Sequence, residues 1–257
     1  MSIEHLSFSS ISSYLYCPKA WKYKYVDKIP TKTTPALLFG SAWHKTIEQA
    51  LKDGNPPKGN YFVEILNEEI KIAASRNQEI IWGEDSLVTL QNTGQRFITS
   101  DSIIEGLSMI TPARDEGGFK IEQKVELNVP GVPLPVIGYI DIITEDGVCG
   151  DFKTSGKSWT NVQAEDSLQP LFYLAALKQA GANPQMKFRH FVFVKTKEPK
   201  FQIVETNYKA KNFLFLYSLI LNIWRSIENQ SFFENPSSWK CSAAHCDFWD
   251  ICRGKFQ

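Results

Sequence analysis

The stretch Asp141–Lys153, with the sequence DIITEDGVCGDFK, decides the fold that we expect for this chain. It predicts two short β-strands joined by a tight turn, because Val and Ile favour strands. Glu145–Gly147 is typical turn sequence, and its glycine can adopt a positive φ. Each arm of the predicted hairpin carries an aspartate, and a lysine follows the second aspartate by two residues.

The length of this turn determines whether the charged groups meet. A three-residue loop sets Asp141 opposite Asp151, whereas a two-residue loop would set it opposite Phe152. Side chains alternate along a strand, so Lys153 shares the face of Asp151. An isolated Asp-x-Lys pattern is also typical of a solvated strand. Two carboxylates a few ångströms apart repel unless a proton or a divalent cation lies between them, and hard oxygen ligands suit Mg or Mn. We interpret the hairpin as a metal site.

The composition is that of an ordinary soluble globular protein. The 257 residues are 43% hydrophobic and 22% charged, and the formal net charge is zero, so any affinity for DNA must come from local patches. The N-terminus lacks a signal-peptide pattern and no apolar run reaches 18 residues, so we expect a cytoplasmic protein without a membrane partner. Five cysteines without a secretory signal argue for metal binding or burial rather than disulfides.

An aspartate late in the predicted strand Val136–Ile143, followed by Asp151–Lys153 on the next strand, resembles the core of the PD-(D/E)xK nucleases. The branch that it resembles is the RecB and AddB nuclease-domain group, which includes the CRISPR-associated adaptation nuclease and many phage exonucleases. The resemblance implies an α/β fold with a restriction-endonuclease-like mixed sheet core flanked by helices.

Residues 37–51, LLFGSAWHKTIEQAL, predict a helix in which His44 and Glu48 lie four apart on one face. A lone helical histidine is usually structural or solvated. The segment also matches the Gly-x-x-x-His motif of the family, however, and that match implies that His44 is a metal ligand. Glu48 is at most a helper.

A second helix is predicted at about Ser167–Ala180, stopped by Gly181. It carries Gln169 and Tyr173, four apart on one face. This spacing means little by itself. One loop after Asp-x-Lys it matches the Gln-x-x-x-Tyr motif of the same branch, which implies that both side chains help to position DNA and the active site.

Residues 7–25, SFSSISSYLYCPKAWKYKY, predict two short helices, the first capped by serine and the second opened by Pro18. Cys17 lies at the break, because the residue before a proline avoids helical geometry. The carboxy-terminal sequence CSAAHCDFWDIC adds further cysteines within 12 residues.

This arrangement resembles the iron-sulfur staple of the branch. The resemblance implies that Cys17, Cys241, Cys246 and Cys252 hold a four-iron four-sulfur cluster that ties the two ends of the chain together. The gap between the first two carboxy-terminal cysteines is longer than the usual Cys-x-x-Cys of the family. With His245 adjacent, an altered ligand set or a zinc site is the alternative. The remaining cysteine, Cys149, is expected to be buried.

The remaining segments predict structure rather than chemistry. Glu122 and Glu126 either face the active cavity or lie exposed on a strand. The expected organisation is a single nuclease domain over residues 1–257, with a helical insertion at about 52–118 and a staple formed by 7–25 and 240–254. Further predicted elements are strands at Phe119–Val129, Lys187–Lys195 and Phe201–Thr206, the last an edge, and a helix at Lys209–Ile227.

The function implied is metal-dependent hydrolysis of DNA phosphodiesters. His44, Asp141, Asp151 and the backbone carbonyl of Phe152 would hold Mg or Mn, and Lys153 would orient the attacking water or stabilise charge on phosphate. By analogy we expect an exonuclease that acts in recombination, repair or phage DNA processing, with partner proteins from those systems. The alternative is a catalytically inactive DNA-binding or assembly subunit, against which the intact charged set speaks. A zinc hydrolase is disfavoured because the chain has four histidines and no His-Glu-x-x-His motif.

Overall fold

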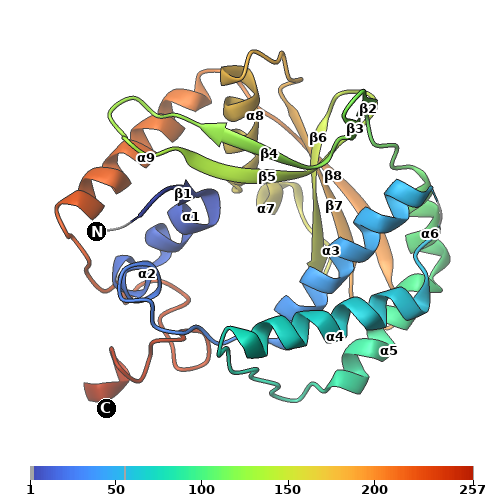
Figure 1. The fold of residues 1–257 in the computed structure, drawn as a ribbon, viewed down its shortest axis with the longest axis horizontal. Coiled ribbons are helices and arrows are strands. Elements are labelled where there is room, and N and C mark those ends of the chain that lie inside the picture. The colour runs from blue at the N-terminus through green and yellow to red at the C-terminus, as the bar shows by residue number, and fades with distance from the viewer. Residues whose placement is uncertain (1–2, 55, 257) are drawn as a thin grey trace.

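The computed structural model describes residues 3–54 and 56–256. Helices and strands alternate along the chain, and Figure 1 shows their arrangement. In chain order they are β1 (Leu6–Ser7), α1 (Phe8–Tyr16), α2 (Pro18–Tyr25), α3 (Pro35–Asp53), α4 (Gly59–Ser75), α5 (Leu87–Ile98), α6 (Asp101–Ser108), β2 (Arg114–Asp115), β3 (Gly118–Phe119), β4 (Ile121–Leu127), β5 (Val136–Ile143), β6 (Cys149–Ser155), α7 (Asn161–Glu165), α8 (Gln169–Gln179), β7 (Lys187–Val194), β8 (Lys200–Asn207), α9 (Asn212–Glu228) and η1 (Gly254–Phe256).

Within the described residues, six strands form one mixed sheet in the order β1-β5-β6-β7-β8, with β4 also paired to β5. The pairs β4–β5, β5–β6 and β7–β8 are antiparallel, whereas β1–β5 and β6–β7 are parallel. The parallel step from β6 to β7 is made through α7 and α8, as a parallel crossover requires. Helices flank this sheet on both faces, so the predicted α/β class is confirmed, and β8 is an edge as predicted.

The central hairpin has the predicted three-residue turn. Ile142 pairs with Gly150, and the backbone N–H of Thr144 donates to the carbonyl of Val148 at 2.9 Å. Gly147 adopts a φ of 78°, which a residue with a side chain rarely takes. The odd loop length therefore gives the strand offset that the sequence predicts.

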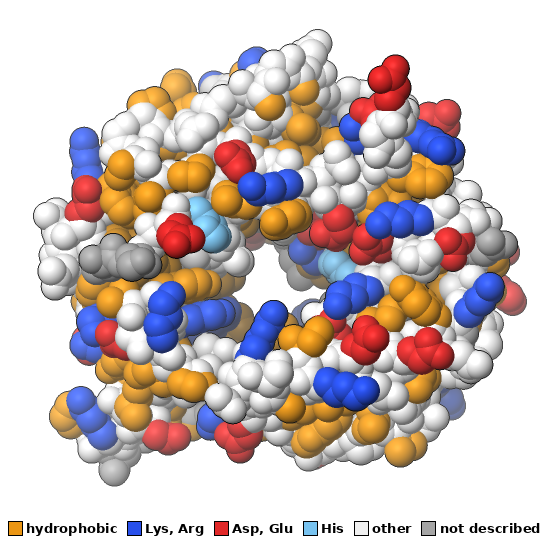
Figure 2. Space-filling view, viewed as in Figure 1, with side chains coloured by type: hydrophobic (Ala, Val, Ile, Leu, Met, Phe, Trp, Pro, Cys, Tyr) orange, Lys and Arg blue, Asp and Glu red, His pale blue; other side chains and the backbone are white. Residues whose placement is uncertain are grey.

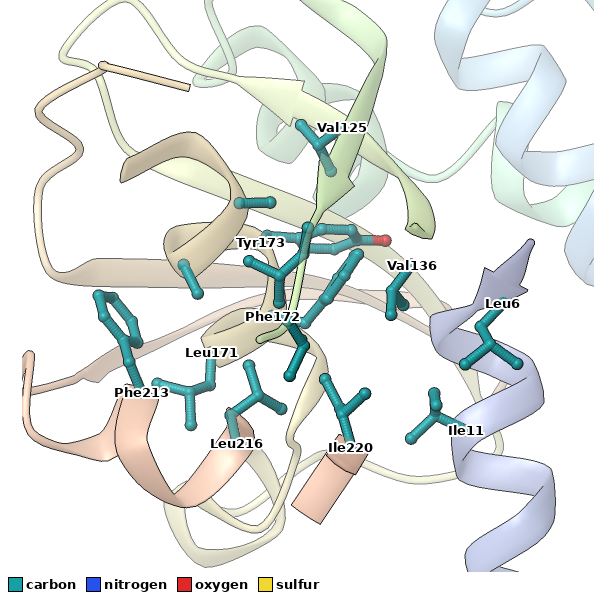
Figure 3. Packing of buried hydrophobic residues seen from close by; sticks show 14 of the residues in the cluster. Leu6, Ile11, Val125, Val136, Leu171, Phe172, Tyr173, Phe213, Leu216 and Ile220 are labelled. Atoms are coloured by element: carbon teal, nitrogen blue, oxygen red, sulfur yellow. The ribbon is translucent and has the colours of Figure 1, made fainter. Parts of the chain in front are cut away.

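The alternation of side chains on the strands builds two large clusters of described buried apolar residues, one on each face of the sheet. One cluster joins β4, β5 and α8 to α1 and α9, and Figure 3 shows part of it around Phe172 and Tyr173. The other packs Phe152, Phe191 and Phe193 of β6 and β7 against α3, α4, α5 and α6. Within the predicted insertion, α6 packs directly against β8, where the Phe201 N–H donates to the Ser102 hydroxyl at 3.1 Å, while α4 and α5 pack on α3.

Local sequence explains where the helices that carry functional residues begin and end. Ser7 and Ser10 form a reciprocal capping box at α1. Thr34 caps α3, Pro35 opens it, and Gly54 ends it with a φ of 64°.

The prediction for residues 52–118 is incomplete, because this segment ends in the β2–β3 hairpin after α4, α5 and α6. The sequence analysis also leaves out β1, which pairs in parallel with the start of β5. Among the helices in the described part of the chain, none is long and apolar enough to cross a membrane.

Candidate active site

The strands β5 and β6 separate just beyond the turn, and Asp141 fills the gap. In the described residues the two strands pair only at the two positions nearest the turn. At the next position the Asp141 carboxylate (Oδ2) accepts a hydrogen bond from the backbone N–H of Phe152 at 2.7 Å. The side chain therefore takes the place of a ladder partner, which holds this carboxylate in a fixed, buried position.

Asp151 and Lys153 form an ion pair on the same face of β6, as the period-two alternation predicts. The Asp151 Oδ2 to Lys153 Nζ distance is 2.6 Å, and Asp151 is only 2% exposed. The ammonium also donates to Gln169 Oε1 at 3.2 Å. Lys153 is therefore fixed between a carboxylate and an amide.

His44 reaches the same place from α3. Its Nδ1 lies 3.5 Å from Asp141 Oδ2, and its ring packs edge-on against the Phe152 ring at 6.0 Å between centroids. Burial lowers the pKa of His44, while the charge of Asp151 and a hydrogen bond with the backbone of Phe152 oppose the shift. A neutral imidazole is the form that binds a metal ion.

The pKa values of Asp141 and Asp151 are shifted in opposite directions. Burial, and then repulsion from Asp151, raises the pKa of Asp141 well above its usual range. Burial is the largest influence on Asp151 and alone would raise its pKa, but the charge and contact of Lys153, together with the nearby His190 and His44, outweigh burial and lower that pKa. A proton on Asp141 or a divalent cation beside both carboxylates would relieve the repulsion.

Asp141→Asn is expected to raise the free energy of unfolding of the metal-free protein at high pH, because the substitution removes a buried acid whose ionisation opposes folding. An acid whose pKa is higher in the folded than in the unfolded state stabilises the fold at low pH. That contribution is lost as the pH rises from about 4 through the folded-state pKa. The stability difference between variant and wild type should therefore grow with pH, which urea unfolding at several pH values would measure.

Asp146→Asn is the control for this series. Its hydrogen bond to Arg189 lowers the pKa of Asp146 to about 2, so its stabilising contribution is lost as the pH falls. The two variants should show opposite trends. A pH-independent difference for Asp141→Asn would contradict the assigned charge state.

Gln169 and Tyr173, the pair predicted on α8, are linked to the site through Lys153. Gln169 Nε2 donates to the Tyr173 hydroxyl at 2.8 Å, while Gln169 Oε1 accepts from Lys153. Tyr173 is buried at 4% exposure, and this burial raises its pKa. Tyr173 therefore orients Gln169, and Gln169 in turn orients Lys153.

Two further groups approach the aspartates. Glu122 falls opposite Asp141 in the β4–β5 register and adopts a φ of 53°, a conformation that residues with side chains rarely adopt. It lines the cavity beside Lys153, whereas Glu126 pairs with Lys124 on the surface. His190 lies next to Asp151 on β7, and sequence analysis gave no sign of it.

An open cavity of about 710 Å³ lies between α3, α4 and β6, and Glu122 is one of the residues that line it. Figure 2, seen in the same direction as Figure 1, shows an opening through the molecule beside α3. Glu48 lines the same cavity, with its carboxylate paired to Lys52 at 2.5 Å. Residues that line the cavity include His44, Glu48, Glu122, Phe152, Lys153 and Lys195.

The two ends of the chain also meet, as the predicted staple requires. The Tyr14 hydroxyl donates to the carbonyl of Ser231 at 2.6 Å, and the N–H of Lys19 donates to the carbonyl of Phe233 at 3.0 Å. A cavity of about 350 Å³ lies between the two ends. The cysteines that line it are Cys17, Cys241, Cys246 and Cys252.

The hairpin site and the cysteine-lined cavity both contain side chains that commonly bind metal ions. In neither site are the described side chains gathered closely enough around one point to bind an ion as they stand. Within residues 3–54 and 56–256, no three His, Cys, Asp or Glu side chains form a set that could hold a metal ion. At the hairpin, Lys153 lies against the Asp151 oxygen. Binding of a cation there would therefore require Lys153 to move. Cys149 begins β6 in the hairpin but lines neither of the two cavities, and burial raises its pKa to about 12.

The chain is similar to known structures and to the model of one protein family. The crystal structure of a protein from Eubacterium rectale, named as a candidate exonuclease, superimposes with a TM-score of 0.63 at 13% identity over 98% of this chain and 88% of that one. The crystal structure of SSO0001 covers 96% of this chain and 98% of its own at 15% identity, with a TM-score of 0.39. No curated protein matches the chain. Residues 5–253 match the model of the PD-(D/E)XK nuclease superfamily, and the chain therefore belongs to that superfamily.

Proposed function

We propose that this protein is a Mg- or Mn-dependent nuclease that hydrolyses DNA phosphodiesters. The observation that carries the proposal is the convergence of a buried aspartate pair, a histidine and a lysine at the gap between β5 and β6. Membership of the superfamily supports the reaction class, because the matched region includes all of these residues.

His44, Asp141, Asp151 and the backbone carbonyl of Phe152 would hold the cation. When bound, the cation would polarise the scissile phosphate and lower the pKa of the attacking water. Lys153, released from Asp151, would stabilise the negative charge that develops on the phosphate. Burial of both aspartates limits access of bulk water and so strengthens these interactions.

The substrate proposal extends to DNA ends and single strands. The opening beside α3 is a route by which one strand end could reach the cavity. Lys195 supports this proposal, because it lines the cavity and its half-buried ammonium can bind a phosphate. The branch resemblance further favours an exonuclease of recombination, repair or phage DNA processing, acting with protein partners of those systems.

If the strand must be threaded, linear single-stranded DNA should be degraded while a covalently closed circle of the same sequence stays intact. The reason is that only a free end can enter an opening bounded by the protein. Gel analysis with Mn²⁺, and with EDTA as the blank, would measure this. The same circle after linearisation is the control. Cleavage of the closed circle at an equal rate would contradict threading and indicate an endonuclease.

Gln169→Ala is expected to lower the cleavage rate about tenfold, because Lys153 loses the amide that orients it. The measurement is the single-turnover rate at saturating Mn²⁺. Gln163→Ala on the exposed side of α7 is the matched control, and its rate should equal that of the wild type. Equal cleavage rates for the two variants would show that Gln169 does not contribute to cleavage.

We further propose that Cys17, Cys241, Cys246 and Cys252 hold a four-iron four-sulfur cluster, with zinc as the alternative. Their common cavity supports this proposal, as does the direct contact between the two ends of the chain. Cysteine thiolates are the usual ligands of such clusters. A tetrahedral zinc site would instead combine some of these cysteines with His245, which also lines the cavity.

The first experiment compares cleavage of end-labelled DNA by wild type and Lys153→Ala, with Mn²⁺, Mg²⁺ or EDTA. Metal-dependent cleavage by the wild type that is lost in the variant supports the proposed function. If both proteins bind DNA and neither cleaves it, the inactive DNA-binding subunit is the better description. Cleavage of RNA but not of DNA would overturn the substrate proposal.

A further inference from the structure

His190 is a buried polar residue that the proposed mechanism leaves unused. This histidine lies in the middle of β7, where the parallel register sets it beside Asp151 of β6. Neighbouring residues in a parallel register point to the same face of the sheet, so the imidazole and the carboxylate share the face covered by α8. His190 is completely buried, and Asp151 nearly so.

The polar atoms of this pair are incompletely satisfied. Within the described residues, neither ring nitrogen of His190 has a hydrogen-bond partner, nor does Oδ2 of Asp151 in hydrogen-bonding geometry. The Nδ1 to Oδ2 distance is 4.0 Å, about 1 Å longer than an N–H···O hydrogen bond. Burying unsatisfied polar groups opposes folding, so the position of His190 calls for a functional reason.

The surroundings of His190 confine the ring. The Trp159 and Phe188 rings both lie 5.1 Å from it, between centroids. An aromatic enclosure of this kind leaves the imidazole little freedom to turn away from β6. The polar neighbour that the described structure offers to Nδ1 is therefore the carboxylate of Asp151.

We propose that His190 is a positioning residue that holds Asp151 in the orientation needed to bind the divalent cation. The inference rests on the proposed function, in which Asp151 is a ligand. Lys153 contacts the same oxygen along β6, whereas His190 approaches it from the adjacent strand. When the ammonium turns to the phosphate, the imidazole remains to orient the carboxylate. Groups that orient a metal ligand in this way commonly set its affinity.

The test is Mn²⁺ binding, measured from the free-ion signal in electron paramagnetic resonance, to wild type and variants at one pH. His190→Leu should weaken Mn²⁺ binding about tenfold or more, because the polar contact is lost. His190→Asn places an amide nitrogen near the position of Nδ1 and should retain most of the affinity. His190→Gln places it nearer Nε2 and should behave like the leucine variant.

Val192→Ala is the control for packing. Val192 is buried two residues further along β7, on the same face, and does not pair with Asp151. It should lower the melting temperature without changing Mn²⁺ affinity. If His190→Leu does not fold, the comparison of the asparagine with the glutamine variant decides the matter, and equal affinities overturn the inference.

The outcomes separate this inference from the proposed function. If the wild type cleaves DNA and His190→Leu binds Mn²⁺ as tightly as the wild type, the function stands and the positioning role is overturned. If the wild type neither binds Mn²⁺ nor cleaves DNA, both fail. Weaker Mn²⁺ binding in His190→Leu, with restoration by asparagine and not by glutamine, supports the positioning role.

Discussion

Replacing Asp151 with asparagine is expected to lower the rate of metal-dependent DNA cleavage about 1,000-fold. Asparagine has nearly the same shape but lacks the charge that holds a divalent cation and the Lys153 ammonium. The fold should survive, because the Lys153 side chain is 29% exposed and can reach water once its partner is neutral. The rate is measured under single-turnover conditions with Mn²⁺, and circular dichroism checks the fold.

Asp146→Asn is the matched control for this substitution. Asp146 lies in the turn of the same hairpin and carries the same charge, but its Oδ2 pairs with Arg189 at 2.7 Å on the far side of the strands. Its loss should cost at most about 1 kcal/mol of stability and leave cleavage unchanged. If both substitutions reduced cleavage equally, the effect would come from the hairpin fold and not from the site.

The hairpin itself could be predicted because its information is local. The parity of a three-residue turn fixes which side chains face each other, and the sequence Glu145–Gly147 specifies that turn. His44 and Gln169 follow from spacings on single helices that match motifs of the resembled family. In each case a short segment contains both the residue and the structure that orients it.

What could not be predicted depends on partners distant in the sequence. His190 stands beside Asp151 only because β7 pairs in parallel with β6, and no local pattern specifies that register. Glu122 faces the cavity because its backbone adopts a positive φ. The alternating sequence around it predicts a regular strand and gives no sign of this conformation. The two-residue strand β1 is too short for any periodicity, and it exists because β5 offers an open edge to Leu6.

The same limit applies to the cysteines, whose convergence depends on how the two ends of the chain pack. We expect Cys17→Ser to abolish bound iron and to lower the stability of anaerobically purified protein by roughly 4 to 5 kcal/mol, the range for a cross-link that closes a very long loop. For a chain of this size that corresponds to a fall of about 10 to 20 °C in the melting temperature. Iron and sulfide analysis with differential scanning calorimetry would measure both.

Cys149→Ala is the decisive comparison, because Cys149 is buried in the hairpin, away from the cavity that Cys17 lines. It removes a thiol from the core and should cost about 1 kcal/mol through lost packing, with no loss of iron. Zinc in place of iron in the wild type would support the alternative ligand set with His245. A wild type that binds neither metal would leave the two ends of the chain held only by contacts such as the Tyr14 hydrogen bond to Ser231, and Cys17→Ser would then melt close to the wild-type temperature.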